Sequence, residues 1–231
     1  MGRTIRNLIY LSIGITVAFQ LLQAFLFTKS AHGQAAQPPK IALPAPQTDS
    51  TFSLEKALAT RRSKRQWKPT PLAIAQLGQL CWAAQGITDA ASGKRTCPSA
   101  MAVYPLELYA LNADGVFHYL PKEHALERIA TDDRRVALGD ACRGQQQVKT
   151  CATAFIITAD MPKAEARLGM GSKPMLYLEA GHCAQNILLQ AVSLGLGGVP
   201  IGAGVDAQIR EVLQLPDNLT ALYVVATGNP Q

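Results

Sequence analysis

The sequence predicts one α+β domain that follows a separate N-terminal segment. The chain has 231 residues, of which 48% are hydrophobic and 16% charged, so it can bury a sizeable core. Helical and strand patterns are interspersed without the regular alternation of a βαβ fold. Residues 153–159 are strand formers with almost no polar side, which is typical of a buried central strand.

Residues 1–33 are expected to be a signal peptide or an N-terminal membrane anchor. Arg3 and Arg6 precede an uncharged run over 7–28, and small residues suited to cleavage follow it. The run is long for a signal-peptide core and long enough to span a bilayer through residues 8–27. Both alternatives place the rest of the chain across the membrane, either exported or anchored.

A Pro/Ala-rich linker is expected over 34–50, and the folded domain over 51–231, with folding beginning near Ser53. The formal net charge is +6, and three of the basic residues lie in 1–33 without any acid, which leaves +3 for the remainder. That balance is too mild for a nucleic-acid-binding protein, so a nucleic-acid partner is not expected.

The elements of the domain follow from apolar periodicity and capping residues. Ser53 caps a short helix, Thr70 and Pro71 open a second, and Gly86 is expected to end the second as a left-handed cap. Helices are expected over 54–59, 71–85, 132–143, 174–194 and 206–213, and strands over 104–111, 116–120, 153–159 and 221–226.

Two of these elements have consequences for the architecture. The strands over 104–111 and 116–120 flank an Asn-Ala-Asp-Gly turn and are expected to form a β-hairpin. The helix over 174–194 is apolar nearly all round, so we expect it to be buried inside the domain or between two subunits.

The stretch Arg61–Trp67 (Arg-Arg-Ser-Lys-Arg-Gln-Trp) has the highest charge density of the chain. Three guanidinium groups and a hydroxyl suit a phosphate monoester, because forked donors match its oxygens in pairs. The alternative is a solvated basic turn at the end of a helix. These residues alone do not decide between the two.

The five cysteines show no spacing of a metal site, and no metal is expected. In an exported domain, Cys142 and Cys151 are the pair expected to form a disulfide. No nucleophile elbow, phosphate-binding loop or zinc-binding helix motif is present, and His182, one turn from Glu179, is interpreted as a structural partner of that carboxylate. A large core without a protein nucleophile indicates that a bound cofactor performs the chemistry.

The basic stretch resembles the opening motif of the FMN-dependent nitroreductase family, and the order of further motifs is closest to its SagB-type dehydrogenase branch. The matching passages are Leu80–Thr88, Arg95–Ala100 with Tyr104–Glu107, Glu179–Asn186 with Gly195–Gly197, and Val199–Gly202. The resemblance covers about residues 53–230. It implies an α+β fold with an antiparallel central sheet flanked by helices, and a dimer built around a long buried helix.

The resemblance also implies a role for particular residues. It implies that Arg61, Arg62, Ser63 and Arg65 hold the phosphate and ribityl end of FMN. It implies that Pro98, Ser99 and Ala100 approach the flavin from the partner of a homodimer, and that Pro200, Ile201 and Gly202 pass along the face of the flavin ring. Taken singly, the Pro98 and Pro200 segments are also compatible with ordinary turns.

The function that follows from the resemblance is an FMN-dependent oxidoreductase, with no catalytic side chain of its own. It would transfer hydride through the flavin N5 to or from a small organic substrate such as a quinone or a nitroaromatic compound, with NAD(P)H as a possible donor. One alternative is a non-catalytic flavin-binding or membrane-associated module on the same fold. Another keeps the enzyme but acts on azoline rings of a modified peptide.

Overall fold

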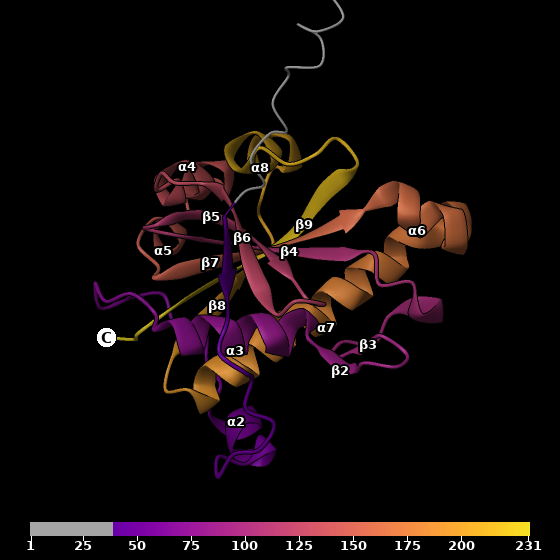
Figure 1. Ribbon diagram of the computed structural model, residues 1–231. Coiled ribbons are helices and arrows are strands. Elements are labelled where there is room, and N and C mark those ends of the chain that lie inside the picture. The colour runs from indigo at the N-terminus through magenta and orange to yellow at the C-terminus, as the bar shows by residue number, and fades with distance from the viewer. Residues whose placement is uncertain (1–38) are drawn as a thin grey trace, which may run out of the picture. The chain divides into compact units, whose positions relative to one another are not determined.

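A seven-stranded antiparallel sheet in the order β1-β6-β5-β4-β7-β9-β8 forms the centre of the molecule (Figure 1). The computed structural model describes residues 39–231, so the expectations for residues 1–33 lie outside its described part. The strands are β1 Lys40–Ala42, β4 Leu106–Asn112, β5 Gly115–Leu120, β6 Ala125–Ala130, β7 Thr153–Asp160, β8 Gly197–Ile201 and β9 Leu219–Gly228, and β2 Ile87–Asp89 pairs separately with β3 Lys94–Arg95.

Helices cover both faces of this sheet. Figure 1 shows α3 and α7 on one side and α4 and α8 on the other. The helices are α2 Leu54–Thr60, α3 Ile74–Gln85, α4 Arg135–Ala141, α5 Gln146–Lys149, α6 Met161–Leu168, α7 Ser172–Ser193 and α8 Asp206–Leu213, with short 3₁₀ turns η1 Ala100–Ala102 and η2 Gly169–Gly171. The predicted α+β fold with a central antiparallel sheet is confirmed.

The alternation of side chains along the strands divides the core into two layers. On β4, Leu108 and Ala110 pack towards α3 and α7, whereas Tyr109 and Leu111 pack towards α4 and α8. Successive residues of a strand point to opposite faces, so a single strand supplies both layers. The expected hairpin is confirmed as β4–β5, and the expected buried strand is β7, whose first seven residues are all buried.

The long helix α7 is buried on one side only within the protomer. Leu176, Cys183 and Ile187 are at most 1% exposed. Its other side leaves Met175, Tyr177 and Leu178 between 46% and 60% exposed. The prediction of a long, largely apolar helix is confirmed, and its apolar surface exceeds what this protomer covers. Within residues 39–231, no helix has the length and hydropathy needed to cross a membrane.

The strands that the sequence does not predict are short or poor in strand formers. Folding begins before Ser53, because Lys40–Ala42 of the expected linker pairs with β6 as an edge strand. β6, with a Glu and an Arg, and β8, with two Gly and one Pro, carry weak strand signals. Pairing with neighbouring strands overrides that weak preference.

The second helix differs at both ends from its prediction. α3 begins at Ile74, where the side chain of Gln76 accepts the N–H of Ala73 at 3.0 Å. Thr70 does not cap it, because its hydroxyl instead accepts a hydrogen bond from the Asn229 side chain at 2.8 Å. Gly86 ends the helix in an extended conformation (φ −63°) and not in the left-handed one. A Cβ there would lie 2.1 Å from the Trp82 ring, so close packing explains this glycine.

The expected disulfide between Cys142 and Cys151 is not formed. All five cysteines are free and buried. The Cys151 thiol donates to the Val148 carbonyl at 3.2 Å, and burial raises its pKa to about 12. Both residues belong to the apolar layer under α4 and α8, where they act as small hydrophobic side chains.

Candidate cofactor site

The basic stretch Arg61–Trp67 runs beside the edge strand β8. Ser63 forms a parallel bridge with Gly198, and the Lys64 N–H donates to the Gly198 carbonyl at 3.1 Å. Trp67 forms an antiparallel bridge with Pro230, at the end of β9. Residues that are about 135 positions apart in the chain thus share one sheet edge. Two of the three predicted site segments, 61–65 and 200–202, are brought to this edge.

Trp67 and a glycine of β8 explain the close approach. The Trp67 side chain is buried, and its indole N–H donates to the Gln147 carbonyl at 2.9 Å. A Cβ on Gly197 would lie 2.8 Å from the Lys64 Cβ and 3.2 Å from the Trp67 ring. Only glycine therefore lets the basic stretch lie against β8 at this distance.

The side chains of the basic stretch differ in how they are bound. The Arg62 guanidinium donates to the carbonyls of Ala59 and Arg61, at 3.0 and 2.7 Å. In the part of the chain that the structure describes, the side chains of Arg61, Ser63 and Arg65 have no hydrogen bond or ion pair. Their backbone is fixed while their donors are free, which is what an anion-binding segment requires.

The segment Pro200–Gly202 leaves space on the side away from the core. Ile201 is buried, Pro200 is half-buried and Gly202 is exposed. A Cβ on Gly202 would meet only Tyr223 Cε2, at 3.8 Å, so neither backbone conformation nor packing in this protomer demands glycine. Close approach of a flat ring to this backbone would explain the glycine, so the residues present fit a flavin here.

The third predicted segment, Pro98–Ala100, is positioned by a buried carboxylate. Ser99 Oγ donates to Glu179 Oε2 at 2.7 Å and accepts the Tyr104 N–H at 2.9 Å. Glu179 therefore pairs with Ser99 and not with His182, which corrects the sequence interpretation. Burial raises the pKa of Glu179, and the hydrogen bond from Ser99 lowers it to a lesser degree.

The backbone after Ser99 is strained. Met101, Ala102 and Tyr104 have φ values of 51°, 53° and 49°, a left-handed region that residues with side chains rarely adopt. Among the described residues, no hydrogen bond or strand pairing joins Pro98–Ala100 to Arg61–Arg65 or to β8. One protomer thus assembles two of the three predicted segments and leaves the third apart.

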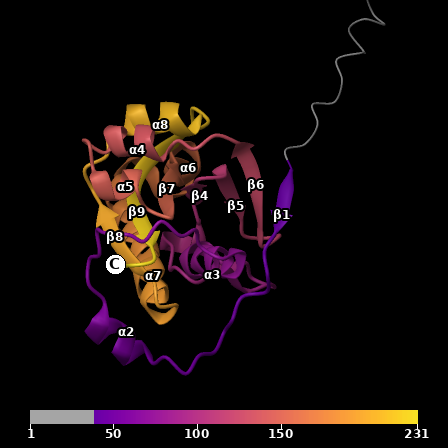
Figure 2. The same ribbon diagram turned by 90° about the vertical axis from the view of Figure 1, so that its left-hand side faces the viewer.

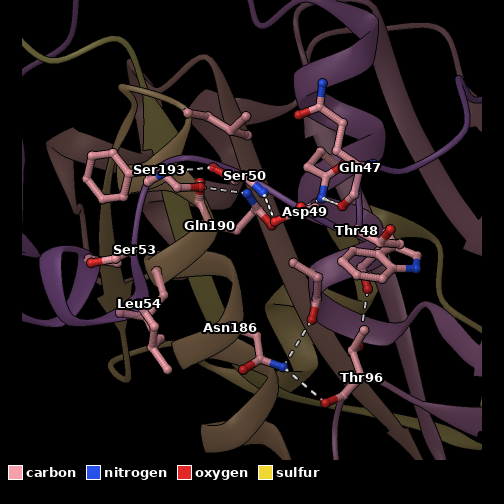
Figure 3. Close-up of a pocket in the computed structure, with 17 residues that line it drawn as sticks. Gln47, Thr48, Asp49, Ser50, Ser53, Leu54, Thr96, Asn186, Gln190 and Ser193 are labelled. Carbon is pink, nitrogen blue, oxygen red and sulfur yellow. Dashed lines mark hydrogen bonds between the residues drawn. The ribbon is translucent and has the colours of Figure 1, made fainter.

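A cavity of about 400 Å³ lies between residues 47–54, α3 and α7 (Figure 3). None of the ten predicted site residues lines it. Asn186 and Gln190, one turn apart on α7, point towards it, and Asn186 Nδ2 donates to the Ala83 carbonyl at 3.1 Å. The spacing of Asn186 and Gln190 by one turn is a weak signal in the sequence, because α7 also carries other polar residues, such as His182 and Gln185.

A family model described as the nitroreductase family matches residues 58–229. A candidate nitroreductase of Methanocaldococcus jannaschii is 36% identical over 172 residues, which are 72% of this chain and 86% of that protein. The NADPH-flavin oxidoreductase of Vibrio harveyi is 46% identical over 114 residues, but only 46% of this chain and 48% of that protein are matched.

The fold is similar to that of a crystal structure of a candidate nitroreductase from Ralstonia eutropha JMP134. The TM-score is 0.76 and the sequence identity 26%, and the match covers 86% of this chain and 96% of that one.

Proposed function

The chain belongs to the nitroreductase family and is an oxidoreductase of that family, and we propose that it binds FMN as a homodimer. In this proposal it transfers a hydride between NAD(P)H and a small organic acceptor such as a quinone or a nitroaromatic compound. The observation that carries the proposal is the basic stretch held against β8, a strand that leads directly to the open Gly202, with the Arg61 and Arg65 guanidinium groups unpaired within residues 39–231.

FMN would supply the chemistry, because its N5 accepts and releases a hydride. Arg61, Ser63 and Arg65 would bind the phosphate and ribityl end, since their donors have no other partner in the described residues. Arg62 would contribute less, because its guanidinium already binds two carbonyls. Pro200, Ile201 and Gly202 would orient the ring by backbone contact and exclude water from one of its faces.

The homodimer in this proposal rests on two observations. Met175, Tyr177 and Leu178 form an exposed apolar group on α7, which is typical of a protein–protein contact surface. A second helix, α2, also has exposed apolar side chains, Leu54 and Leu58. Dimer formation would also explain why Pro98–Ala100 lies apart from the other two segments, since the partner would bring its own copy to the flavin.

A further part of the proposal concerns the location of the protein. We propose that residues 1–33 direct the domain across a membrane or anchor it there through residues 8–27. Cell fractionation followed by N-terminal sequencing of the purified protein tests this. Recovery of an uncleaved chain in the soluble cytoplasmic fraction would exclude both forms of the proposal.

The cofactor is tested on the full-length protein, reconstituted with FMN and then desalted. We expect a bound flavin spectrum and turnover of NAD(P)H with a quinone or nitroaromatic acceptor. No flavin absorbance after desalting would exclude FMN binding. Bound flavin without turnover for any such pair would instead support a non-catalytic flavin-binding module.

A further inference from the structure

A second cavity, of about 320 Å³, lies on the sheet face opposite α3 and α7, away from the proposed flavin site. Strands β4, β5 and β6 form its floor, and Asp160 together with the loop before β9 forms its wall. Tyr109 on this floor belongs to the core layer under α4 and α8. No residue of the basic stretch or of β8 lines this cavity, and β7 and β9 lie between β4 and β8 in the sheet order, so the cavity is separate from both.

The floor of this cavity is a row of interacting polar side chains. Tyr109, His118 and Glu127 are directly opposite one another on β4, β5 and β6, so their side chains share a face. The His118 ring stacks on Tyr109 with centroids 4.8 Å apart. His118 Nε2 lies 2.9 Å from Glu107 Oε2, and its Nδ1 lies 3.9 Å from Glu127 Oε2.

The cavity has a strong excess of negative charge. Three carboxylates, Glu107, Glu127 and Asp160, line it, and no Lys or Arg does. Two nearby lysines are bound elsewhere. Lys40 is opposite Glu127 in the strand register, but its ammonium binds Glu123 at 2.8 Å. The ammonium of Lys163 donates to the Tyr104 carbonyl at 2.8 Å. The one basic side chain that lines the cavity, His118, cannot neutralise the negative charge of three carboxylates.

Tyr109 provides an independent indication that a ligand binds here. This residue is only 4% exposed and lines the cavity, yet within residues 39–231 its hydroxyl has no hydrogen-bond partner. The hydroxyl oxygen is not among the fully enclosed unpaired atoms of the described residues, so it is accessible from the cavity, and buried tyrosines usually use this group in a hydrogen bond. Burial and the nearby Glu107 and Glu127 raise the pKa of Tyr109 to about 12, so the group stays a neutral hydroxyl at physiological pH.

We propose that this cavity binds a small organic ammonium ligand, with Glu107, Glu127 and Asp160 as its counter-charges and the Tyr109 hydroxyl as a hydrogen-bond acceptor. Among the described residues, no three His, Cys, Asp or Glu side chains are grouped to hold a metal ion. The carboxylates are thus spread around a space for a molecule and not for a bare cation.

The test is calorimetric titration of the purified full-length protein with putrescine, with butane-1,4-diol as the uncharged analogue and Mg²⁺ as a bare cation. We expect saturable putrescine binding and none of the diol. Glu127→Gln should weaken putrescine binding about tenfold or more, because it removes a charge-assisted contact without changing shape. Glu165→Gln, an exposed acid on α6, is the matched control and should have no effect.

Tyr109→Phe provides a second variant that keeps the ring and its packing. We expect it to weaken putrescine binding while the thermal midpoint stays close to that of the unchanged protein. The proposal is wrong if the unchanged protein does not bind putrescine at millimolar concentration, or binds the diol or Mg²⁺ equally well. It is also wrong if folded Glu127→Gln and Tyr109→Phe variants both bind putrescine unchanged.

Discussion

The segments Arg61–Trp67 and Pro98–Tyr104 both carry predicted flavin contacts, but the structure holds their backbones in different ways. The first is fixed by backbone bridges to Gly198 of β8 and to Pro230 after β9 and by the buried Trp67 indole, and within residues 39–231 the side chains of Arg61 and Arg65 have no partner. The second is fixed through a side chain, Ser99 on Glu179, and its backbone is strained. The first therefore suits recognition by charge, and the second suits placement of a backbone surface.

Trp67→Ala should have the largest effect, because this side chain attaches the first segment to the sheet. Loss of a buried indole is expected to lower the free energy of unfolding by about 3–5 kcal/mol. Urea denaturation monitored by circular dichroism measures it. Trp67→Phe keeps most of the packing and loses the bond to Gln147, so it should cost much less. Equal losses in both variants would show that the hydrogen bond, and not packing, anchors the segment.

Removing a free cation should affect binding and not folding. Arg61→Ala and Arg65→Ala are each expected to weaken FMN binding about tenfold or more, since each loses charge-assisted hydrogen bonds to phosphate. Fluorescence quenching of FMN during titration measures the affinity. Lys68→Ala removes an exposed cation just beyond the stretch and is the control. Unchanged affinity in both Arg variants would return the stretch to an ordinary basic turn.

Two glycines of the same edge should respond differently to the same added methyl group. Gly197→Ala is expected to cost about 1–3 kcal/mol in unfolding free energy, because its Cβ would lie 2.8 Å from Lys64 Cβ. Gly202→Ala should leave stability within about 0.5 kcal/mol, since only Tyr223 is near, but should weaken FMN binding. If Gly202→Ala binds FMN normally, no ring lies close to that backbone.

Glu179→Gln should change how the stability of the protein depends on pH. Burial raises the pKa of Glu179 above its usual 4.5, so the folded state holds this proton more tightly than the unfolded state. The protein then loses stability as pH rises from 4.5 through the raised pKa, and the Gln variant does not. Thermal midpoints across this range measure the difference. Glu165→Gln should show no such divergence, and parallel curves for Glu179→Gln would contradict the prediction.

Much of this arrangement is predictable from the sequence, for physical reasons that differ between regions. The helix at Asp206–Leu213 and the capping of α2 by Ser53 follow from local patterns, and both are as predicted. The strand β8 does not, because Gly197, Gly198 and Pro200 disfavour strands and only pairing with β9 makes them one. The strands β1 and β6 are likewise not predictable from their local sequence, and pairing with neighbouring strands forms them.

The site also combines features that the sequence predicts with features that only the fold determines. Ordered motifs pointed to Arg61–Arg65 and to Pro200–Gly202, and the structure brings these segments to one edge. The pairing of Ser99 with Glu179 was not predictable from spacing, because 80 residues separate them and His182 offered a nearer partner. Local spacing suggests possible pairs, whereas burial and distance in the fold decide between them.

The position of β1, as the first strand of the domain and an edge strand of the sheet, has a mechanical consequence. Any pulling force on the chain ahead of Lys40 enters the domain through this three-residue strand and its ladder to β6. Figure 2 shows β1 and β8 at opposite edges of the sheet, with five strands between them in the sheet order. Such a load reaches β1 first, and only after β1 has detached from β6 would it pass along the chain to α2 and the basic stretch.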